Sequence, residues 1–243
     1  MIKPASKALL VVPLVGILTV PLVQADDWTG KGELGYVLVS GNTESETLNA
    51  ALKFEKIHNK WKHNAKFSAI TSEADDSNGV KVKSSDSVSA GWRSQYSLSE
   101  RAYTFGDFRY FDDKFDSFEE IYTASFGFGY SVIKQEMMTW DISLGVGYRD
   151  TTDEVTQEDL SGVSYLIESD YQYQITESTK FENDTRFELN SDNNFVQNVA
   201  GLSVSINSSL ALKLLYDVRY NSDPSPGFDS TDRIFSTNIV YSF

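Results

Sequence analysis

Residues 210–220 read LALKLLYDVRY, and this stretch decides the fold class of the chain. Every second residue is apolar or aromatic, and charged residues lie between them. The apolar series is Leu210, Leu212, Leu214, Tyr216, Val218 and Tyr220, and the charges between them are Lys213, Asp217 and Arg219. Because successive side chains of a strand point to opposite faces, this pattern predicts one face towards hydrocarbon and one towards a polar interior. Such strands are typical of transmembrane β-barrels.

The same alternation recurs along the chain and predicts twelve strands. They are residues 28–40, 45–58, 61–72, 81–97, 102–111, 121–132, 140–149, 161–176, 180–190, 195–206, 210–220 and 232–243. Their lengths match or exceed the roughly 9 to 11 residues that a tilted strand needs to cross a bilayer. Short connections alternate with mostly long ones, as periplasmic turns alternate with outer loops. We therefore predict an all-β, closed antiparallel transmembrane barrel of about 12 strands with a polar lumen over residues 26–243.

Two predicted strands break the alternation. In residues 102–111, Phe105 shares a face with Asp107 and Arg109, and in residues 195–206, Asn198 lies among apolar residues. We expect either strand to contain a bulge or to be paired one residue out of register.

The first 25 residues have the features of an export signal. Lys3 and Lys7 give a positive start, residues 8–23 form an apolar run, and residues 23–25 read VQA, a small-residue cleavage site. The competing interpretation is a membrane anchor, but a spanning helix needs roughly 20 apolar residues and this run is shorter. We predict a signal peptide over residues 1–25 and a mature chain that begins at Asp26.

The mature chain is strongly acidic, with 19 basic residues after the loss of Lys3 and Lys7 and 35 acidic ones. Nucleic acid is therefore excluded as a partner, because binding it depends on clustered Lys and Arg that neutralise phosphates. The chain has no cysteine, which excludes disulfides and thiolate metal sites. No cofactor is predicted.

A soluble lipocalin-like barrel is the competing fold. It would hide its apolar residues inside and show its charges outside. The predicted strands do the reverse, and an apolar exterior requires lipid or a partner.

The alternation assigns 11 basic and 10 acidic residues to the lumen. An interior so balanced predicts charge pairs across strands rather than a field that selects anions or cations. The predicted lumen charges are Lys53, Glu55, Arg93, Asp107, Arg109, Arg149, Glu168, Asp170, Asp184, Arg186, Lys213, Asp217 and Arg219, together with Lys31, Glu33, Lys62, Lys66, Asp141, Lys180, Glu182 and Glu188.

Two functional hypotheses follow from this interior. A twelve-stranded barrel is wide enough to enclose a narrow polar path, which would make the protein a channel for small polar solutes or ions. Alternatively, the long charged side chains interdigitate and close the bore, which would leave a structural barrel without transport. The sequence leaves both open.

An acidic run after residue 111 suggests weak cation contact. Carboxylates at Asp112, Asp113 and Asp116 could hold a divalent cation that bridges to lipopolysaccharide phosphates. The run lacks the glycine turn and regular spacing of a calcium loop, which favours a solvated surface and no metal site.

A barrel hydrolase is the third hypothesis, and the histidines argue against it. The chain has only His58 and His63, and both fall at the predicted periplasmic end. This is the wrong rim for an outward-facing lipase or protease, so we predict that the protein is not an enzyme.

Glycine–aromatic motifs carry a family resemblance. They are Trp28-Thr29-Gly30 with Gly35, Ser40-Gly41-Asn42-Thr43, residues 110–115, Gly127-Phe128-Gly129-Tyr130 and the LGVGYR run at residues 144–149. In this order they resemble the YdiY-like, salt-induced outer-membrane protein family, a domain of unknown function. The resemblance implies a porin-like barrel in the outer membrane of Gram-negative bacteria, linked in some members to salt or acid response, without an established substrate or catalytic residue.

The end of the chain carries a second resemblance. Ile239, Tyr241 and Phe243 lie on one face of the last predicted strand and resemble the terminal signal that the barrel assembly machinery reads. The expected partners are therefore this machinery, outer-membrane lipid and lipopolysaccharide.

Overall fold

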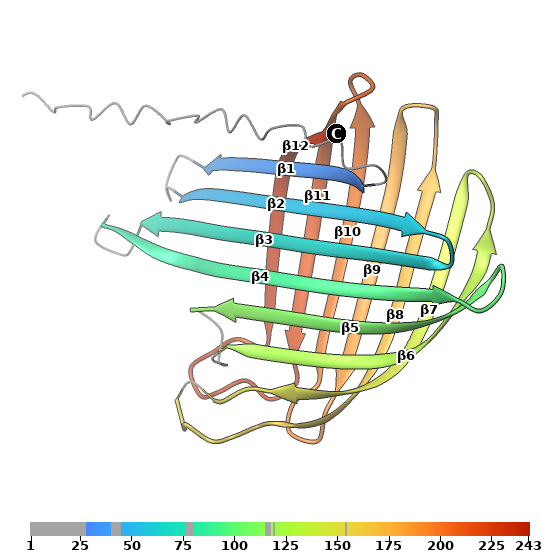
Figure 1. The fold of residues 1–243 in the computed structure, drawn as a ribbon. Helices are drawn as coiled ribbons and strands as arrows, with labels where there is room; N and C mark the ends of the chain where they lie inside the picture. Colours follow the sequence, from blue (N-terminus) through green and yellow to red (C-terminus); the bar gives the residue numbers. More distant parts are fainter. Residues whose placement is uncertain (1–27, 40–44, 76–79, 115–117, 119, 154) are drawn as a thin grey trace, which may run out of the picture.

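The computed structural model describes residues 28–39, 45–75, 80–114, 118, 120–153 and 155–243. In this part of the chain, twelve antiparallel strands form one closed barrel, which confirms the predicted fold (Figure 1). The predicted signal peptide lies outside the described residues. The strands are β1 (Trp28–Val39), β2 (Ser45–His58), β3 (Trp61–Asp75), β4 (Lys81–Ser97), β5 (Ala102–Asp113), β6 (Ile121–Lys134), β7 (Met138–Asp150), β8 (Gly162–Gln174), β9 (Thr179–Leu189), β10 (Phe195–Ser205), β11 (Leu210–Asn221) and β12 (Thr231–Ser242).

Each strand pairs with its neighbours in the sequence, and β1 pairs with β12 to close the ring. Backbone hydrogen bonds join Gly30 and Phe243 in both directions, at 2.9 and 3.0 Å. A Cβ at residue 30 would lie 2.3 Å from the Phe243 ring, so a larger residue there would displace this ring. Closure is essential in hydrocarbon, where each unpaired amide costs several kcal/mol.

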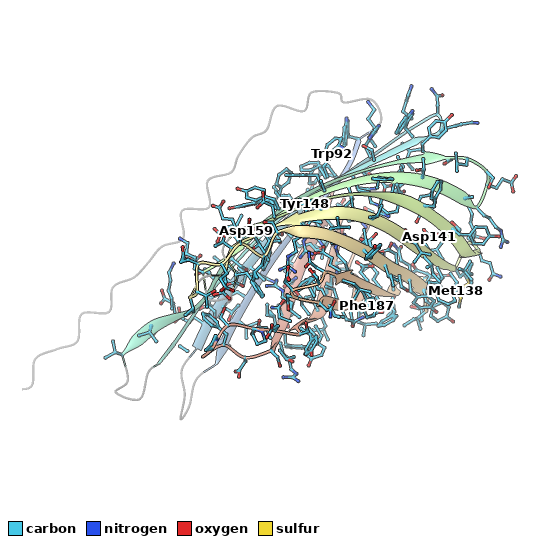
Figure 2. The ribbon with its side chains drawn as sticks, turned by 90° about the horizontal axis from the view of Figure 1, so that it is seen from below. Trp92, Met138, Asp141, Tyr148, Asp159 and Phe187 are labelled. Carbon is cyan, nitrogen blue, oxygen red and sulfur yellow. The ribbon has the colours of Figure 1, made fainter. Side chains whose placement is uncertain are left out.

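The two ends of the barrel differ in their connections. We call the end with the short connections the turn end; its links are residues 59–60, 98–101, 135–137, 175–178 and 206–209. We call the opposite end the loop end; its links are residues 40–44, 76–80, 114–120, 151–161, 190–194 and 222–230. In Figure 2, Met138 lies at the turn end and Asp159 at the loop end. The first residue of β1 and the last of β12 both lie at the turn end.

The exterior of the barrel is apolar. On β6, buried and exposed residues alternate from Ile121 to Tyr130, and Phe126 and Phe128 are 65% and 67% exposed. Aromatic side chains pack together near each end, for example Trp61 with Tyr96 at the turn end, with ring centroids 5.0 Å apart. An exposed apolar belt with aromatic rims is the surface that a transmembrane barrel presents to lipid.

Both strands with a broken alternation are regular, so the expected bulge or register slip is wrong for them. Phe105 is buried in the lumen with Tyr103 and Leu166. Asn198 faces outwards, where its amide and that of Asn183 exchange hydrogen bonds of 3.2 Å. The register shifts occur elsewhere, at Ser72/Glu73 and Ser131/Ile133. Phe105 can lie inside the barrel because it packs in an apolar cluster there. Asn198 can lie outside because its amide is hydrogen-bonded to that of Asn183.

Candidate functional site: the barrel lumen

The lumen is the site where the charges of this chain gather. Arg219 on β11 and Asp113 on β5 are six positions apart in the ring of twelve strands, yet their side chains lie 3.4 Å apart. Contacts of this kind cross the bore from one wall to the other. The residues that the sequence assigns to the lumen lie on the same inward face of their strands as the residues that make these contacts. Their neighbours differ between the two ends of the barrel.

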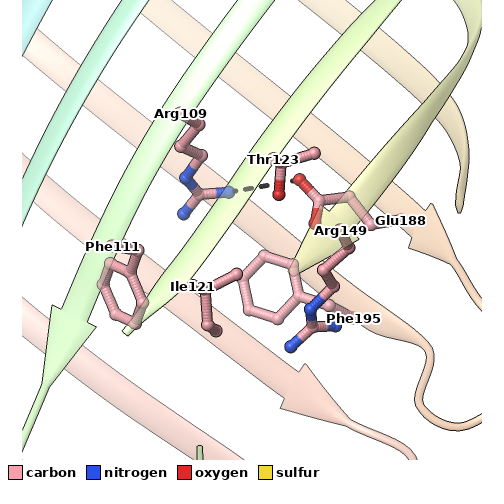
Figure 3. Close-up of a pocket in the computed structure, with 7 residues that line it drawn as sticks. All are labelled: Arg109, Phe111, Ile121, Thr123, Arg149, Glu188 and Phe195. Carbon is pink, nitrogen blue, oxygen red and sulfur yellow. Dashed lines mark ion pairs between the residues drawn. The ribbon is translucent and has the colours of Figure 1, made fainter. Parts of the chain in front are cut away.

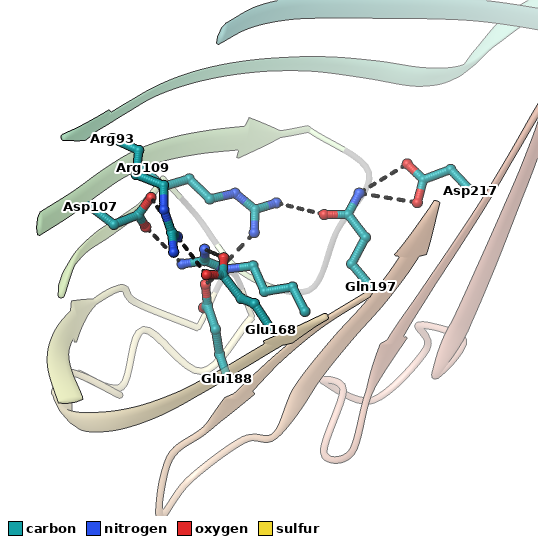
Figure 4. Close-up of polar contacts among 8 residues, drawn as sticks. Arg93, Asp107, Arg109, Glu168, Glu188, Gln197 and Asp217 are labelled. Carbon is teal, nitrogen blue, oxygen red and sulfur yellow. Dashed lines mark hydrogen bonds and ion pairs between the residues drawn. The ribbon is translucent and has the colours of Figure 1, made fainter. Parts of the chain in front are cut away.

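Arg186 contacts three carboxylates in the lumen, Glu168, Asp107 and Glu188, which are labelled in Figure 4. Its Nη1 lies 2.6 Å from Glu168 Oε1, its Nη2 lies 3.1 Å from Asp107 Oδ1, and its Nε lies 2.5 Å from Glu188 Oε1. Arg93 reaches Glu168 from the other side, with Nη1 2.5 Å from Oε2. These five residues come from β4, β5, β8 and β9, so the contacts tie two walls of the barrel together.

The chain of contacts continues across β10 and β11. Arg109 Nη1 lies 3.7 Å from Glu188, and Arg109 Nη2 donates to Gln197 at 3.1 Å. Gln197 in turn donates to Asp217 at 3.0 Å, and Asp217 lies 3.2 Å from Arg219 Nε. The bridging network, as we call it, consists of Arg93, Asp107, Arg109, Asp113, Glu168, Arg186, Glu188, Gln197, Asp217 and Arg219.

An apolar plug lies beside the bridging network at the loop end, and Figure 3 shows its members Phe111, Ile121 and Phe195. It consists of Phe111, Phe118, Ile121 and Phe195, which are all buried. The guanidinium of Arg149, itself 2% exposed, lies 5.2 Å from the Phe118 ring centroid. Phe111, Ile121, Phe195 and Arg149 line a cavity that measures about 10 Å³, roughly the space of one water molecule. The side chains therefore leave little free space in this part of the lumen.

The connections at the loop end hold the plug in place. Phe118 forms a backbone bridge with Asp153, and the Asp153 carboxylate accepts a hydrogen bond from the Ser225 hydroxyl. The same carboxylate accepts the backbone N–H groups of Val155 and Thr156, at 2.9 and 2.7 Å. Donation by Ser225, and then by the backbone of Thr156, lowers the pKa of Asp153. Asp153 thus links three connections, two of them through its carboxylate and the third through its backbone.

In the turn-end half, three lysines stand side by side. Lys31 on β1, Lys53 on β2 and Lys66 on β3 are direct cross-strand partners and form what we call the lysine row. Lys53 Nζ lies 3.0 Å from Glu33 Oε1. Lys31 and Lys66 are exposed, and neither has a carboxylate within ion-pair distance in the described part of the chain.

Three aspartates form a matching row. Asp141 on β7 pairs with Asp170 on β8, which pairs with Asp184 on β9, and we call them the aspartate row. Within the described residues, their carboxylates form no ion pair or side-chain hydrogen bond. Strands β7, β8 and β9 are six positions from β1, β2 and β3, so the rows lie on opposite walls. Asp184 interacts electrostatically with Lys66 and Lys53 across the lumen.

The charges of the turn-end half are balanced in number but separated in space. Lys53 and Lys213 share Glu33, and Lys180 and Lys213 share Glu182. Lys31 and Lys66 make no ion pair, so this half holds five lysines and only two paired glutamates, and the surplus of three positive charges equals the number of aspartates in the aspartate row. The expectation that a balanced interior pairs its charges is therefore wrong for this half.

A signal for the rows is present in the sequence, although the alternation alone does not reveal it. The two-residue link at residues 59–60 pairs His58 with Trp61, and this register brings Lys53 opposite Lys66. Counting back from a tight turn thus identifies like charges on neighbouring strands.

The described carboxylates of the acidic run after residue 111 do not face one another. Asp113 points into the lumen and pairs with Arg219, whereas Asp112 is on the outward face of β5, so the two cannot share an ion. Asp116 lies outside the described residues. In the part of the chain that the structure describes, no group of three His, Asp or Glu side chains is arranged to hold a metal.

The histidines lie at the turn end. The His58 ring contacts the Asn59 amide at 2.9 Å, within the link between β2 and β3. His63 is on the outward face, where Nδ1 lies 2.9 Å from Ser94 Oγ and the ring stacks on Trp61. The described residues place no carboxylate within hydrogen-bond distance of His63, so this hydroxyl–imidazole pair lacks a third group to orient it.

Known proteins share this architecture. The NanC porin aligns over 89% of this chain and 98% of its own, at 12% identity and a TM-score of 0.51. An outer-membrane channel from Pseudomonas putida F1 aligns over 89% and 94%, at 8% identity and the same TM-score. At these identities, the two comparisons show a common fold and nothing more.

Sequence comparison identifies the family. The uncharacterized protein YdiY of Escherichia coli (strain K12) is 24% identical over 216 residues, which are 88% of this chain and 82% of YdiY. The model of the family described as protein of unknown function, DUF481, matches residues 32–243. This range includes all of the barrel after the first few residues of β1, and the chain belongs to the DUF481 family.

Proposed function

We propose that this protein is a channel of the bacterial outer membrane that passes small polar solutes or ions. The observation that carries the proposal is the set of exposed, unpaired charges inside the barrel, above all Lys31, Lys66 and Asp184. A charge that has no partner must stay hydrated, because burial of an unpaired ion costs several kcal/mol. The turn-end half of the lumen therefore holds water, which a conducting path requires.

A closed structural barrel is the second candidate, and the bridging network favours it. Arg186, Glu168 and Asp107 join opposite walls, and the apolar plug fills the remaining space at the loop end. For conduction, the plug and the connections above it have to move. The channel proposal therefore states that this conformation is closed at the loop end and open at the turn end.

Single-channel recording in planar bilayers tests the proposal. The purified barrel is expected to give discrete steps of current that switch between closed and open levels, because the plug opens and closes as a unit. Phe126→Ala, on the lipid face, is the matched control for insertion. Absence of steps above the lipid background, with insertion verified by heat-modifiable migration, would exclude the channel and support the structural barrel.

The location and the physiological role form part of the same proposal. The apolar belt and aromatic rims support insertion in the outer membrane, with the loop end facing the cell exterior and lipopolysaccharide around it. The outward-facing Tyr241 and Phe243 at the barrel seam support recognition by the assembly machinery. A role in salt or acid response rests on the family resemblance. Growth of a deletion strain in high salt or at low pH tests that role.

The protein is proposed to have no enzymatic activity. The described residues place no carboxylate beside the hydroxyl–imidazole pair of Ser94 and His63. Ser94 Oγ also accepts a hydrogen bond of 2.9 Å from the Trp92 indole N–H. Lipid and peptide hydrolysis by the purified protein, compared with that of a His63→Gln variant, tests this conclusion.

A further inference from the structure

We propose that the turn-end half of the lumen binds small zwitterions, whose anionic group meets the lysine row and whose cationic group meets the aspartate row. The inference rests on the proposed channel function, because it assigns a solute class to the same lumen. It is carried by the register of six strands, which places three lysines on β1–β3 opposite three aspartates on β7–β9.

The first argument is the direction of the field. Each row has one sign, and the two rows lie on opposite walls, so the field between them points across the bore. A solute with a single charge is attracted by one row and repelled by the other. A zwitterion that spans the bore is attracted at both ends, and its dipole aligns with the field. The arrangement therefore favours molecules such as amino acids over simple anions or cations.

The second argument is that the rows destabilise the barrel. Like charges directly opposite each other on neighbouring strands are unfavourable, and each row contains two such pairs. Elsewhere in the lumen, the same chain pairs Arg93 and Arg186 with carboxylates at 2.5–3.1 Å. A departure from local stability rules at one place in a fold indicates a functional constraint there.

The third argument is access. Lys31, Lys66 and Asp184 are exposed although they point into the barrel, and the connections at the turn end are short. A solute can thus reach the rows from the turn end while the plug closes the other end. Binding does not require the channel to conduct.

Binding is measured on the detergent-purified barrel by isothermal titration calorimetry at pH 7 and low ionic strength. Glycine and 4-aminobutyrate are the zwitterionic probes, and acetate and methylammonium carry the separate charges. At least one zwitterion is expected to bind about tenfold more tightly than either ion, because two charge contacts form instead of one. Equal affinities for all four probes would overturn the inference.

Substitutions in the rows make the test specific to sign. Lys66→Gln is expected to weaken zwitterion binding about fivefold to tenfold and to weaken acetate more than methylammonium. Asp184→Asn is expected to weaken methylammonium more than acetate. A purely structural role of these residues would change both ions alike, and that result would contradict the inference. Lys31→Gln and Asp170→Asn repeat the test if either first variant fails to fold.

The matched controls are Lys62→Gln and Glu55→Gln. These residues also face the lumen near the turn end, but their side chains pair with each other at 2.8 Å and belong to neither row. Affinity is expected to stay within about twofold in both variants. Zwitterion binding without single-channel currents would refute the channel and retain the site, whereas currents with no preference for zwitterions would refute the site alone.

Discussion

The loop-end and turn-end halves of the lumen treat similar charges in opposite ways. In the loop-end half, Arg186 contacts three carboxylates, and the side chains of Glu188 and Arg219 are nearly inaccessible to water. In the turn-end half, Lys66 and Asp184 face each other across the bore without a close contact and remain exposed. Ion pairs engage Arg186 and its neighbours in the loop-end half, whereas Lys66 and Asp184 in the turn-end half are accessible to water.

This difference shows that the partner available to a lumen charge depends on which strands carry the charges around it. In the loop-end half, charges of opposite sign occur on strands whose side chains meet, such as Asp113 on β5 and Arg219 on β11. In the turn-end half, like charges occupy neighbouring strands and opposite charges face each other from six strands away. Long side chains pair across the first half, whereas Lys31, Lys66 and Asp184 in the second half stay exposed.

The largest effect is expected from loss of Arg186. Arg186→Met leaves the carboxylates of Glu168, Glu188 and Asp107 without their shared cation in a part of the lumen where all are largely buried. Breaking a buried ion pair on one side costs about 3–5 kcal/mol. Urea unfolding in lipid vesicles, followed by tryptophan fluorescence, should show a loss of unfolding free energy of this size.

Lys62→Met is the control for Arg186→Met. It breaks an ion pair with Glu55 in which both side chains are more than a third exposed, and such pairs contribute about 0–1 kcal/mol. Equal losses in the two variants would mean that the two halves of the lumen do not differ in how strongly they use their charges.

Removal of the Phe118 ring is expected to have the next largest effect. Phe118 is 1% exposed between Phe111, Ile121 and the Arg149 guanidinium. Phe118→Ala should lower the unfolding free energy by about 3 kcal/mol, because a buried phenyl ring leaves a cavity. Open time in single-channel recordings should rise, since the plug loses its central contact. An unchanged open time would show that the plug does not control conduction.

Asp170→Asn should have a smaller effect of opposite sign. The substitution removes the middle charge of the aspartate row, which lies directly opposite Asp141 on one side and Asp184 on the other. Relief of like-charge repulsion on neighbouring strands is expected to raise the unfolding free energy by about 0.5 kcal/mol. The same urea titration measures it, and Glu55→Gln is the neutral control. A loss of stability would contradict the distinction between the two halves.

The sequence predicts the strands well because lipid and lumen impose a strict period of two. β2 and β4 have the predicted bounds, and β5 extends two residues beyond its predicted end to Asp113. Contacts across the bore are not predictable in this way. Phe105 appeared misplaced because its neighbour Leu166 comes from β8, a strand that does not pair with β5 and meets it only across the lumen. The lysine row and the aspartate row were not predicted, because counting lumen charges does not say which of them face each other on neighbouring strands.

The smallest effect concerns pH at the loop end. The Ser225 hydroxyl and the Thr156 backbone N–H hold the pKa of Asp153 below its ordinary value of 3.8. A carboxylate with a lowered pKa in the folded state contributes its full stability above about pH 3.8 and loses it as the pH falls through the folded-state pKa. Hydrogen exchange of the amides in residues 151–161, corrected for intrinsic rates, should therefore be constant between pH 7 and pH 5 and faster at pH 3.

Variants of the same connections separate this effect from general acid destabilisation. Asp153→Asn should exchange faster already at pH 7 and lose most of the added acceleration at pH 3, because no carboxylate remains to be protonated. Asp229→Asn removes a carboxylate from the connection that also contains Ser225 and should behave as the unmodified protein does. If hydrogen exchange of the backbone amides of β1–β3 became faster together with that of residues 151–161, acid would be destabilising the whole barrel. Acceleration confined to the loop end would show that its closure can be released while the turn-end half stays intact.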